Sequence, residues 1–243
     1  MNIWAHRGCS QMYPENTLTA FKKAAKIDGL TGIELDIQLT RDGHMAVFHD
    51  ETVDRTTDGS GELRQYTLSE LKKLRIDAGS GKQEQIPAME EVFDLLQDKI
   101  KQGLKMNIEL KNSIFPYKGI EQKIVDMVHQ YGLQNCVIYS SFSALSLERI
   151  RQLDPEAEIG ILDAKVSDCL YKLKGGCGAD ALHPFWKGMD LPKERLEGYT
   201  VRAWLTGHLY PERATGTKLD LASLEKQGIT DVFLNEPEKY LSI

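Results

Sequence analysis

The sequence of 243 residues predicts an α/β fold, a (β/α)8 TIM barrel with a small insertion after the second strand. Three observations support this class. Short β-type runs alternate with amphipathic helical runs along the chain, which is typical of a parallel sheet. Eight such strands fit a length close to that of a typical barrel. The alternative is an open doubly wound sheet, but no glycine-rich nucleotide-binding fingerprint follows the first strand.

Each predicted strand is a short run rich in apolar residues and bounded by turn-forming or polar residues. These runs are Asn2–Ala5, Gly32–Gln38, Leu104–Leu110, Cys136–Ser140, Glu158–Leu162, Ala179–His183, Thr200–Leu205 and Thr230–Leu234. Between them lie runs with apolar residues at helical spacing. The predicted helices are Glu15–Ile27, a short one near Thr67–Leu74, Met89–Ile100, Ile120–Tyr131, Ala144–Leu153 and Leu219–Gln227. Asn16 or Thr17 is expected to cap the first of them.

A segment after the second strand interrupts this alternation. Residues 40–43 carry the turn signal Thr-Arg-Asp-Gly, so Leu35–Thr40 and His44–Phe48 are predicted to form a β-hairpin. The predicted insertion follows at about residues 51–87, which are rich in Thr, Asp and Gly. Because insertions at the carboxyl end of a barrel strand cover the active-site face, we expect this one there. No linker or compositional break divides the chain, so residues 1–243 are expected to form a single barrel domain.

The composition excludes several classes of partner. The net charge is −6 and the pI is near 5.6, with no basic run, so nucleic-acid binding is disfavoured. The sequence contains neither a membrane-spanning stretch nor a signal-peptide pattern, so no stable membrane insertion is expected. The four cysteines form no Cys-x-x-Cys pair and are expected to be free thiols. We therefore expect a cytoplasmic protein, or a periplasmic or secreted one if a signal peptide was removed; nothing indicates the oligomeric state.

Ionisable residues at alternate positions of two apolar strands are the most informative feature. Glu34 and Asp36 lie in one strand, and Glu109 and Lys111 in or just after another, so each pair points to one face. Buried acids require a cation or a partner that compensates their charge. Three carboxylates supply hard oxygen ligands of the kind that Mg²⁺ and Ca²⁺ prefer, and they leave positions open for water and substrate. The alternative is a structural network of salt bridges.

Further candidate residues lie at the carboxyl ends of strands, where barrels of this class build their active sites. His6 and His49 can act as acid and base on opposite sides of a reacting phosphorus. Arg7 and Lys111 offer positive charge to a phosphate. Trp204 either packs against the carbon skeleton of a substrate or fills the top of the barrel. No role is assigned to the remaining histidines, which are expected to be surface or packing residues: His44, His129, His183 and His208.

The same residues stand in stretches that resemble the glycerophosphodiester phosphodiesterase family, densely over residues 3–111 and more thinly afterwards. The matching stretches are Ala5-His6-Arg7-Gly8, Pro14-Glu15-Asn16-Thr17, Glu34-Leu35-Asp36, Thr40-Arg41-Asp42-Gly43, Val47-Phe48-His49-Asp50, Asp54-Arg55-Thr56-Thr57, Gly59-Ser60-Gly61, Ile86-Pro87, Asn107-Ile108-Glu109-Leu110-Lys111, Tyr139-Ser140-Ser141-Phe142 and Trp204.

The resemblance implies a metal-dependent enzyme that hydrolyses a small glycerophosphodiester to an alcohol and glycerol 3-phosphate. It implies that a divalent ion, Ca²⁺ or Mg²⁺, is bound at Glu34, Asp36 and Glu109. It also implies a catalytic pair at His6 and His49. Phosphate contacts are implied at Arg7 and Lys111.

The C-terminal part departs from the family pattern. Leu205-Thr206-Gly207-His208 stands where Val-Asn commonly follows the tryptophan, and Leu234-Asn235-Glu236-Pro237 where Thr-Asp-x-Pro is common. The stretch Thr206–Lys218 is longer than usual, so these changes are expected to affect substrate choice. Three other functions remain open: a phosphodiesterase of the lysophospholipase D or sphingomyelinase D kind, a metal-dependent lyase or isomerase of the enolase kind, and a non-catalytic binder.

Overall fold

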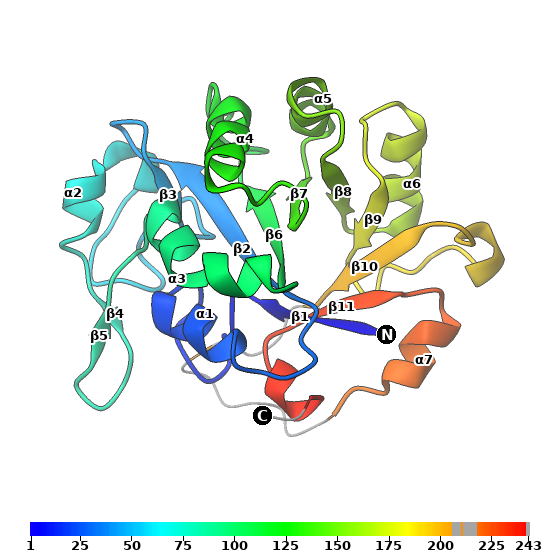
Figure 1. The fold of residues 1–243 in the computed structure, drawn as a ribbon, viewed down its shortest axis with the longest axis horizontal. Coiled ribbons are helices and arrows are strands. Elements are labelled where there is room, and N and C mark those ends of the chain that lie inside the picture. Colours follow the sequence, from blue (N-terminus) through cyan, green and yellow to red (C-terminus); the bar gives the residue numbers. More distant parts are fainter. Residues whose placement is uncertain (206–209, 211–217, 242–243) are drawn as a thin grey trace.

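The computed structural model describes residues 1–205, 210 and 218–241. Over these residues, eight parallel strands pair in succession around a closed barrel, and the last pairs back onto the first. Helices lie around the outside of the strands (Figure 1). The predicted barrel is therefore confirmed. The barrel strands, in order, are β1 (Asn2–His6), β2 (Gly32–Leu39), β6 (Lys105–Leu110), β7 (Val137–Ser141), β8 (Glu158–Asp163), β9 (Ala181–Pro184), β10 (Thr200–Trp204) and β11 (Asp231–Leu234).

The predicted helices are present with changes at their ends. Helices α4 (Ile120–Tyr131) and α5 (Ala144–Leu153) have the predicted bounds, and α3 (Met89–Lys101) is one residue longer than predicted. Helix α1 (Leu18–Ala24) is shorter than predicted at both ends, and so is α7 (Leu221–Lys226). The late start of α1 has a local cause. The Thr17 hydroxyl caps this helix by accepting a hydrogen bond from the backbone N–H of Ala20 at 3.2 Å.

One helix, α6 (Val166–Lys174), was not predicted from the sequence. Its buried residues Val166, Cys169 and Leu170 follow the helical spacing, so the periodic signal is present. The start signal is absent, because the N-cap residue Lys165 makes no side-chain capping bond.

The predicted hairpin after β2 is confirmed. Strand β3 (Met45–Val47) pairs antiparallel with β2. The chain then forms η1 (Leu63–Gln65), α2 (Leu68–Leu71), and the two-stranded sheet of β4 (Ile76–Asp77) and β5 (Gln83–Glu84), which project to one side of the barrel (Figure 1). These elements share an apolar cluster separate from the main core, made of Ala46, Phe48, Val53, Leu63, Leu71, Ile76 and Ile86.

Strand β2 shows how the sequence divides the two faces of the barrel wall. Ile33, Leu35 and Ile37 belong to the main apolar core, which also includes residues of the surrounding helices. The alternate residues Glu34 and Asp36 point to the other face, the barrel interior, as the two-residue period of a strand requires. Among the described residues, no helix combines the length and apolar character that a membrane crossing requires.

Candidate active site

The three predicted acidic ligands converge at the carboxyl end of the barrel interior. Asp36 of β2 and Glu109 of β6 are neighbours in the strand register, and Glu34 lies one inward-facing position before Asp36. One carboxylate oxygen from each residue lies within 4.8 Å of the others. The three residues are 0–9% exposed. Three negative groups are thus confined in a space from which water is largely excluded.

The electrostatics of this acidic cluster favour a cation. Burial, and then repulsion from Asp36 and Glu109, raise the pKa of Glu34 well above its usual value. Burial also acts to raise the pKa of Asp36, but His49 and Arg7 hold that pKa below its usual range. The Oδ1 atom of Asp36 is buried and has no hydrogen-bond partner among the described residues. A divalent ion fits this donor set, because it would supply positive charge to the three carboxyl groups and a partner to Oδ1 of Asp36.

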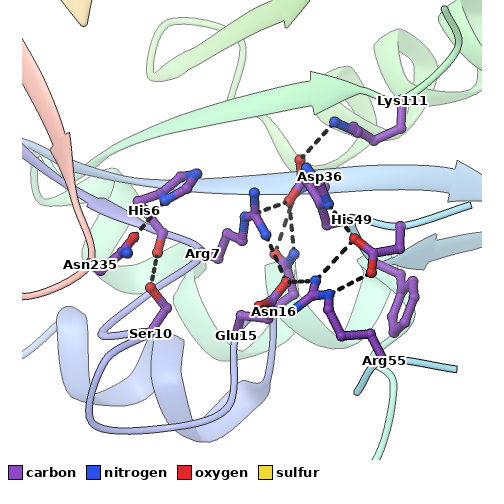
Figure 2. A network of polar contacts seen from close by, with 12 residues as sticks. His6, Arg7, Ser10, Glu15, Asn16, Asp36, His49, Arg55, Lys111 and Asn235 are labelled. Carbon is purple, nitrogen blue, oxygen red and sulfur yellow. Dashed lines mark hydrogen bonds and ion pairs between the residues drawn. The ribbon is translucent and has the colours of Figure 1, made fainter. Parts of the chain in front are cut away.

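His6, the last residue of β1, faces the acidic cluster. Its Nδ1 lies 2.6 Å from Oδ1 of Asn235 (Figure 2). Its Nε2 lies 3.9 Å from Oε2 of Glu34. An amide oxygen can only accept, so Nδ1 carries the proton and Nε2 keeps its lone pair. Burial, and then the Arg7 guanidinium, lower the pKa of His6 to about 3. His6 therefore presents an unprotonated nitrogen to the cluster.

His49 follows β3 and is oriented by different partners. Its Nδ1 lies 2.6 Å from Oδ1 of Asp50, which leaves Nε2 free for a substrate. The backbone here is held by Gln38, a fully buried residue of β2. The Gln38 amide donates to the carbonyl oxygens of Phe48, His49 and Asp50 at 3.0, 3.2 and 2.7 Å. A barrel side chain thus fixes the segment that carries His49.

Arg7 lies where the chain leaves β1 in a tight turn. Its φ is +56° and that of Gly8 is +81°; a Cβ on Gly8 would lie 2.7 Å from the backbone of Ala20. The backbone N–H of Arg7 donates to Glu34 Oε2 at 2.9 Å. Its guanidinium donates to Glu15 Oε1 at 2.7 Å and lies 3.4 Å from Asp36 Oδ2. The turn therefore aims a buried cation at the acidic cluster.

Lys111 brings the second cation. Its ammonium donates to Glu109 Oε1 at 2.8 Å and lies 4.0 Å from Asp36 Oδ1 (Figure 2). Although burial acts to lower the pKa of Lys111, Glu109 and Asp36 raise it above its usual value. The side chain is therefore a permanent positive charge beside the acidic ligands.

A cavity of about 290 Å³ joins these groups to an aromatic wall. Trp204 and Phe142 line it, with their rings 6.2 Å apart in an edge-to-face arrangement. The indole N–H of Trp204 donates to the backbone carbonyl of His183 at 3.2 Å, which fixes the plane of the ring. The other residues around the cavity are His6, Arg7, Glu34, His49, Asn107, Glu109, Lys111, Ser140, Leu162, His183 and Phe233. Charged and aromatic side chains therefore line the same cavity, and the Lys111 ammonium lies 5.9 Å from the centre of the Phe142 ring.

Sequence reasoning assigned no role to His183, but the structure places it in the wall of this cavity. The residue is fully buried in the barrel interior and packs on Phe233 with a ring separation of 5.6 Å. Space for its ring comes from Gly160, where a Cβ would lie 2.2 Å from the imidazole. The His183 ring fits beside a glycine of the neighbouring strand. Such a contact between strands is not visible in the local sequence around either residue.

Two other site residues were also missed. Asn16, expected as a possible helix cap, instead donates to Asp36 Oδ2 at 2.8 Å from a backbone with φ of +55°. Asn235, part of a stretch expected to affect substrate choice, contacts His6. The other departure, the long stretch 206–218, lies outside the described residues except for Tyr210 and Lys218.

Comparison with known proteins agrees with this arrangement. The sequence profile of the Glycerophosphoryl diester phosphodiesterase family matches residues 6–172. A glycerophosphodiester phosphodiesterase of Caldanaerobacter subterraneus subsp. tengcongensis is 38% identical over 244 residues, which cover 99% of this chain and 96% of the relative. One from Bacillus altitudinis is 40% identical over 197 residues, covering 79% of this chain and 78% of the relative.

A solved structure is similar over the same length. It is a phosphodiesterase of Oleispira antarctica in complex with the product sn-glycerol-3-phosphate, with a TM-score of 0.78 and 29% identity. The match covers 98% of this chain and 94% of the other. The profile begins at His6 and spans both strands that carry the acidic cluster, and the similarity to whole relatives runs from one end of the chain to the other. This chain is therefore a member of the glycerophosphodiester phosphodiesterase family.

Proposed function

We propose that this protein hydrolyses glycerophosphodiesters to an alcohol and glycerol 3-phosphate. The observation that carries the proposal is the convergence of three buried carboxylates beside two histidines and two cations, in a cavity with an aromatic wall. Membership of the family supports the reaction class, and the Oleispira antarctica relative holds sn-glycerol-3-phosphate as its product. We further propose that residues 1–243 act as one catalytic domain, in which residues 51–87 form an insertion beside the active site.

Glu34, Asp36 and Glu109 would hold a divalent ion. Their oxygens are hard ligands, which favours Mg²⁺ or Ca²⁺ over zinc, and the unpartnered Oδ1 of Asp36 supports a ligand at this point. When bound, such an ion lowers the pKa of a coordinated hydroxyl and offsets negative charge on phosphoryl oxygens.

His6 and His49 would exchange protons with the substrate. One histidine takes the proton of a glycerol hydroxyl as its oxygen attacks phosphorus, and the other protonates the alcohol that leaves. A cyclic phosphate results, and water opens it with the two histidines in reversed roles. Asn235 supports this use of His6 because it occupies Nδ1 and leaves Nε2 available. Asp50 does the same for His49 and also stabilises its protonated form.

The charged and aromatic residues that line the cavity suggest how the substrate is held. Arg7 and Lys111 would contact phosphate oxygens and offset the charge that grows on them during the reaction. Trp204, which lines the same cavity, would pack against the carbon skeleton of the glycerol moiety.

The experiment is direct. Purified protein is incubated with a panel of glycerophosphodiesters, such as glycerophosphocholine and glycerophosphoethanolamine, with Mg²⁺, Ca²⁺ or a chelator. Phosphorus species are followed by NMR. We expect release of glycerol 3-phosphate with one of the two ions and none with the chelator. Hydrolysis of lysophospholipid or sphingolipid micelles without hydrolysis of the water-soluble diesters would contradict the proposed substrate class.

A further inference from the structure

Arg55 occupies an unusual position in the polar network of the site (Figure 2). Its Nε and Nη2 donate to Asp50 Oδ2 and Oδ1 at 2.6 and 3.0 Å. Its Nη1 and Nη2 donate to Glu15 Oε2 and Oε1 at 2.8 and 2.7 Å. All three nitrogens of the guanidinium are therefore used, and each of the two carboxylates is held at both of its oxygens.

The same two carboxylates contact the groups assigned to catalysis. Asp50 Oδ1, one of the oxygens that Arg55 holds, lies 2.6 Å from Nδ1 of His49. Glu15 Oε1, another oxygen that Arg55 holds, accepts from the Arg7 guanidinium at 2.7 Å. Arg55 is thus linked through Asp50 to the proton-transfer group His49, and through Glu15 to the phosphate-binding group Arg7.

These connections join separate parts of the chain. Glu15 lies in the loop between β1 and α1, whereas Asp50 and Arg55 lie in the segment after β3. The Glu15 side chain is 6% exposed, so its negative charge requires partners, while the Arg55 side chain is 43% exposed and reaches inward from the surface. A planar guanidinium can hold two carboxylates by paired bonds with fixed geometry, and an ammonium cannot.

We propose that Arg55 is a positioning residue, which sets His49 and Arg7 relative to each other by bridging Asp50 and Glu15. The inference rests on the proposed function, since it assigns Arg55 a role in that same reaction. Arg55 does not line the cavity that holds the acidic cluster, so the inference assigns it no contact with the substrate. Its effect reaches the reaction by two routes, through Asp50 to the proton transfer and through Glu15 to the phosphate contact.

The two routes predict different kinetic effects. Asp50→Asn weakens the hold on His49 and is expected to lower kcat, whereas Glu15→Gln weakens the hold on Arg7 and is expected mainly to raise KM. Arg55→Ala is expected to do both and to lower kcat/KM by about 10–100-fold, as is typical when a group that orients a catalytic side chain is removed. Because Arg55 acts through Asp50, the double variant R55A/D50N is expected to lose less than the product of the two single losses.

Arg64 offers a matched control. It is an arginine of the same segment with a side chain 40% exposed, close to the 43% of Arg55. It pairs with Glu62 and lies over the ring of Phe115, and none of its described contacts reaches the catalytic groups. Arg64→Ala is therefore expected to keep kcat and KM close to those of the wild type.

The experiment measures kcat and KM for glycerophosphodiester hydrolysis, together with melting temperature, for the wild type and these variants. Guanidinium chloride at low millimolar concentration, with ammonium chloride as the ionic control, is then added to R55A. Saturable recovery of kcat with guanidinium alone supports the inference, because a loss of folded protein would not be reversed. Arg55→Lys keeps the positive charge but lacks the planar guanidinium that holds two carboxylates. It is expected to have impaired hydrolysis at a melting temperature near that of the wild type.

The outcomes separate the two proposals. Wild-type protein that hydrolyses no glycerophosphodiester overturns the proposed function, and the inference with it. An active wild type beside R55A and R55K variants with wild-type kcat and KM overturns the inference alone. A loss of kcat/KM in R55A/D50N equal to the product of the two single losses also overturns the inference alone.

Discussion

Charged residues are buried at both ends of the barrel interior, but their balance differs. At the amino end, Arg202 pairs with Glu158 and lies 3.6 Å from Asp231. Lys105 lies 3.5 Å from Glu158, and although these two side chains are partly exposed, two carboxylates there face two cations. At the carboxyl end, three carboxylates of the acidic cluster share Arg7 and Lys111, and Arg7 is also bound by Glu15. A buried set with equal numbers of positive and negative groups can stabilise the fold without a ligand. A buried set with excess negative charge requires a bound cation to compensate it.

The difference assigns distinct tasks to the two ends. Residues at the amino end of a barrel interior contribute to stability, and those at the carboxyl end to catalysis. Substitutions at the amino end should therefore change the free energy of unfolding, and those in the acidic cluster should change the rate. The following experiments test whether the two ends have these separate tasks.

The largest expected effect is on the histidines. His6→Asn and His49→Asn should each lower kcat by about 10²–10⁴-fold, because each removes a proton-transfer group. Their melting temperatures should stay close to that of the wild type. Release of glycerol 3-phosphate and thermal unfolding are measured side by side. His44→Asn, which alters a half-exposed histidine far from the cavity lining, is the control. Near-normal turnover of either site variant would contradict the pair assignment.

At the amino end, Arg202→Met should lower the free energy of unfolding by about 3–5 kcal/mol, because it leaves Asp231 buried without its cation. The protein that remains folded should keep its kcat. Urea unfolding and activity at low temperature test both points. Arg195→Met, at an exposed arginine, should change the free energy of unfolding by no more than about 0.5 kcal/mol. A variant of Arg202 that is stable but inactive would abolish the distinction between the two ends.

In the acidic cluster, Glu34→Gln should lower the rate by about 10²–10³-fold. In chelator, the same change should leave the melting temperature equal or higher, because it relieves the repulsion that raises the pKa of Glu34. Thermal unfolding with and without Mg²⁺ or Ca²⁺ measures this, and the variant should lose most of the stabilisation that the ion gives to the wild type. A fall of several degrees in chelator would instead identify the cluster as a structural network.

The smallest expected effect concerns Asp50, which lies near the catalytic end but is held by two partners, His49 and Arg55. Although burial acts to raise the pKa of Asp50, His49 and Arg55 hold it below its usual range. The stability that it contributes is therefore present above the unfolded pKa of about 3.9 and is lost as the pH falls through the lower folded value. Asp50→Asn should cost about 1–3 kcal/mol at pH 7.

The measurement is the free energy of unfolding of D50N and wild type between pH 7 and pH 2. The difference should narrow as the pH falls below about 4, because Asp50 of the unfolded wild-type chain is protonated there before Asp50 of the folded protein. If the difference in the free energy of unfolding between D50N and wild type stays constant over this range, the ion pairs of Asp50 do not explain its contribution to stability.

Much of the fold was predictable, because strand periodicity and strand-end chemistry are local signals. All eight barrel strands lie within two residues of their predicted ends. The acidic cluster was predictable for the same reason, since Glu34, Asp36 and Glu109 occupy inward positions of neighbouring strands. Helix α6 was missed because Lys165 gives no capping signal at its start.

The residues that orient the site were not predictable. Asn235 is 229 positions from His6, and Arg55 is 40 positions from Glu15. Such contacts depend on barrel closure and on the path of the segment after β3, and no local pattern in the sequence encodes them. The expectation that Asn16 or Thr17 caps the first helix is met by Thr17, and the role of Asn16 in the site was not predictable because a residue type that caps helices can equally bond to a side chain of a neighbouring strand.

Strand β2 links folding and chemistry through the alternation of its side chains. Ile33, Leu35 and Ile37 face the apolar core, and Glu34 and Asp36 face the site. Deleting or adding one residue in this strand would exchange the faces of these two sets of side chains. The apolar residues would then point into the cavity, and the acids would be buried among the apolar side chains of the core. Single-residue indels in β2 should thus be eliminated in any library selected for expression alone, before activity is ever screened.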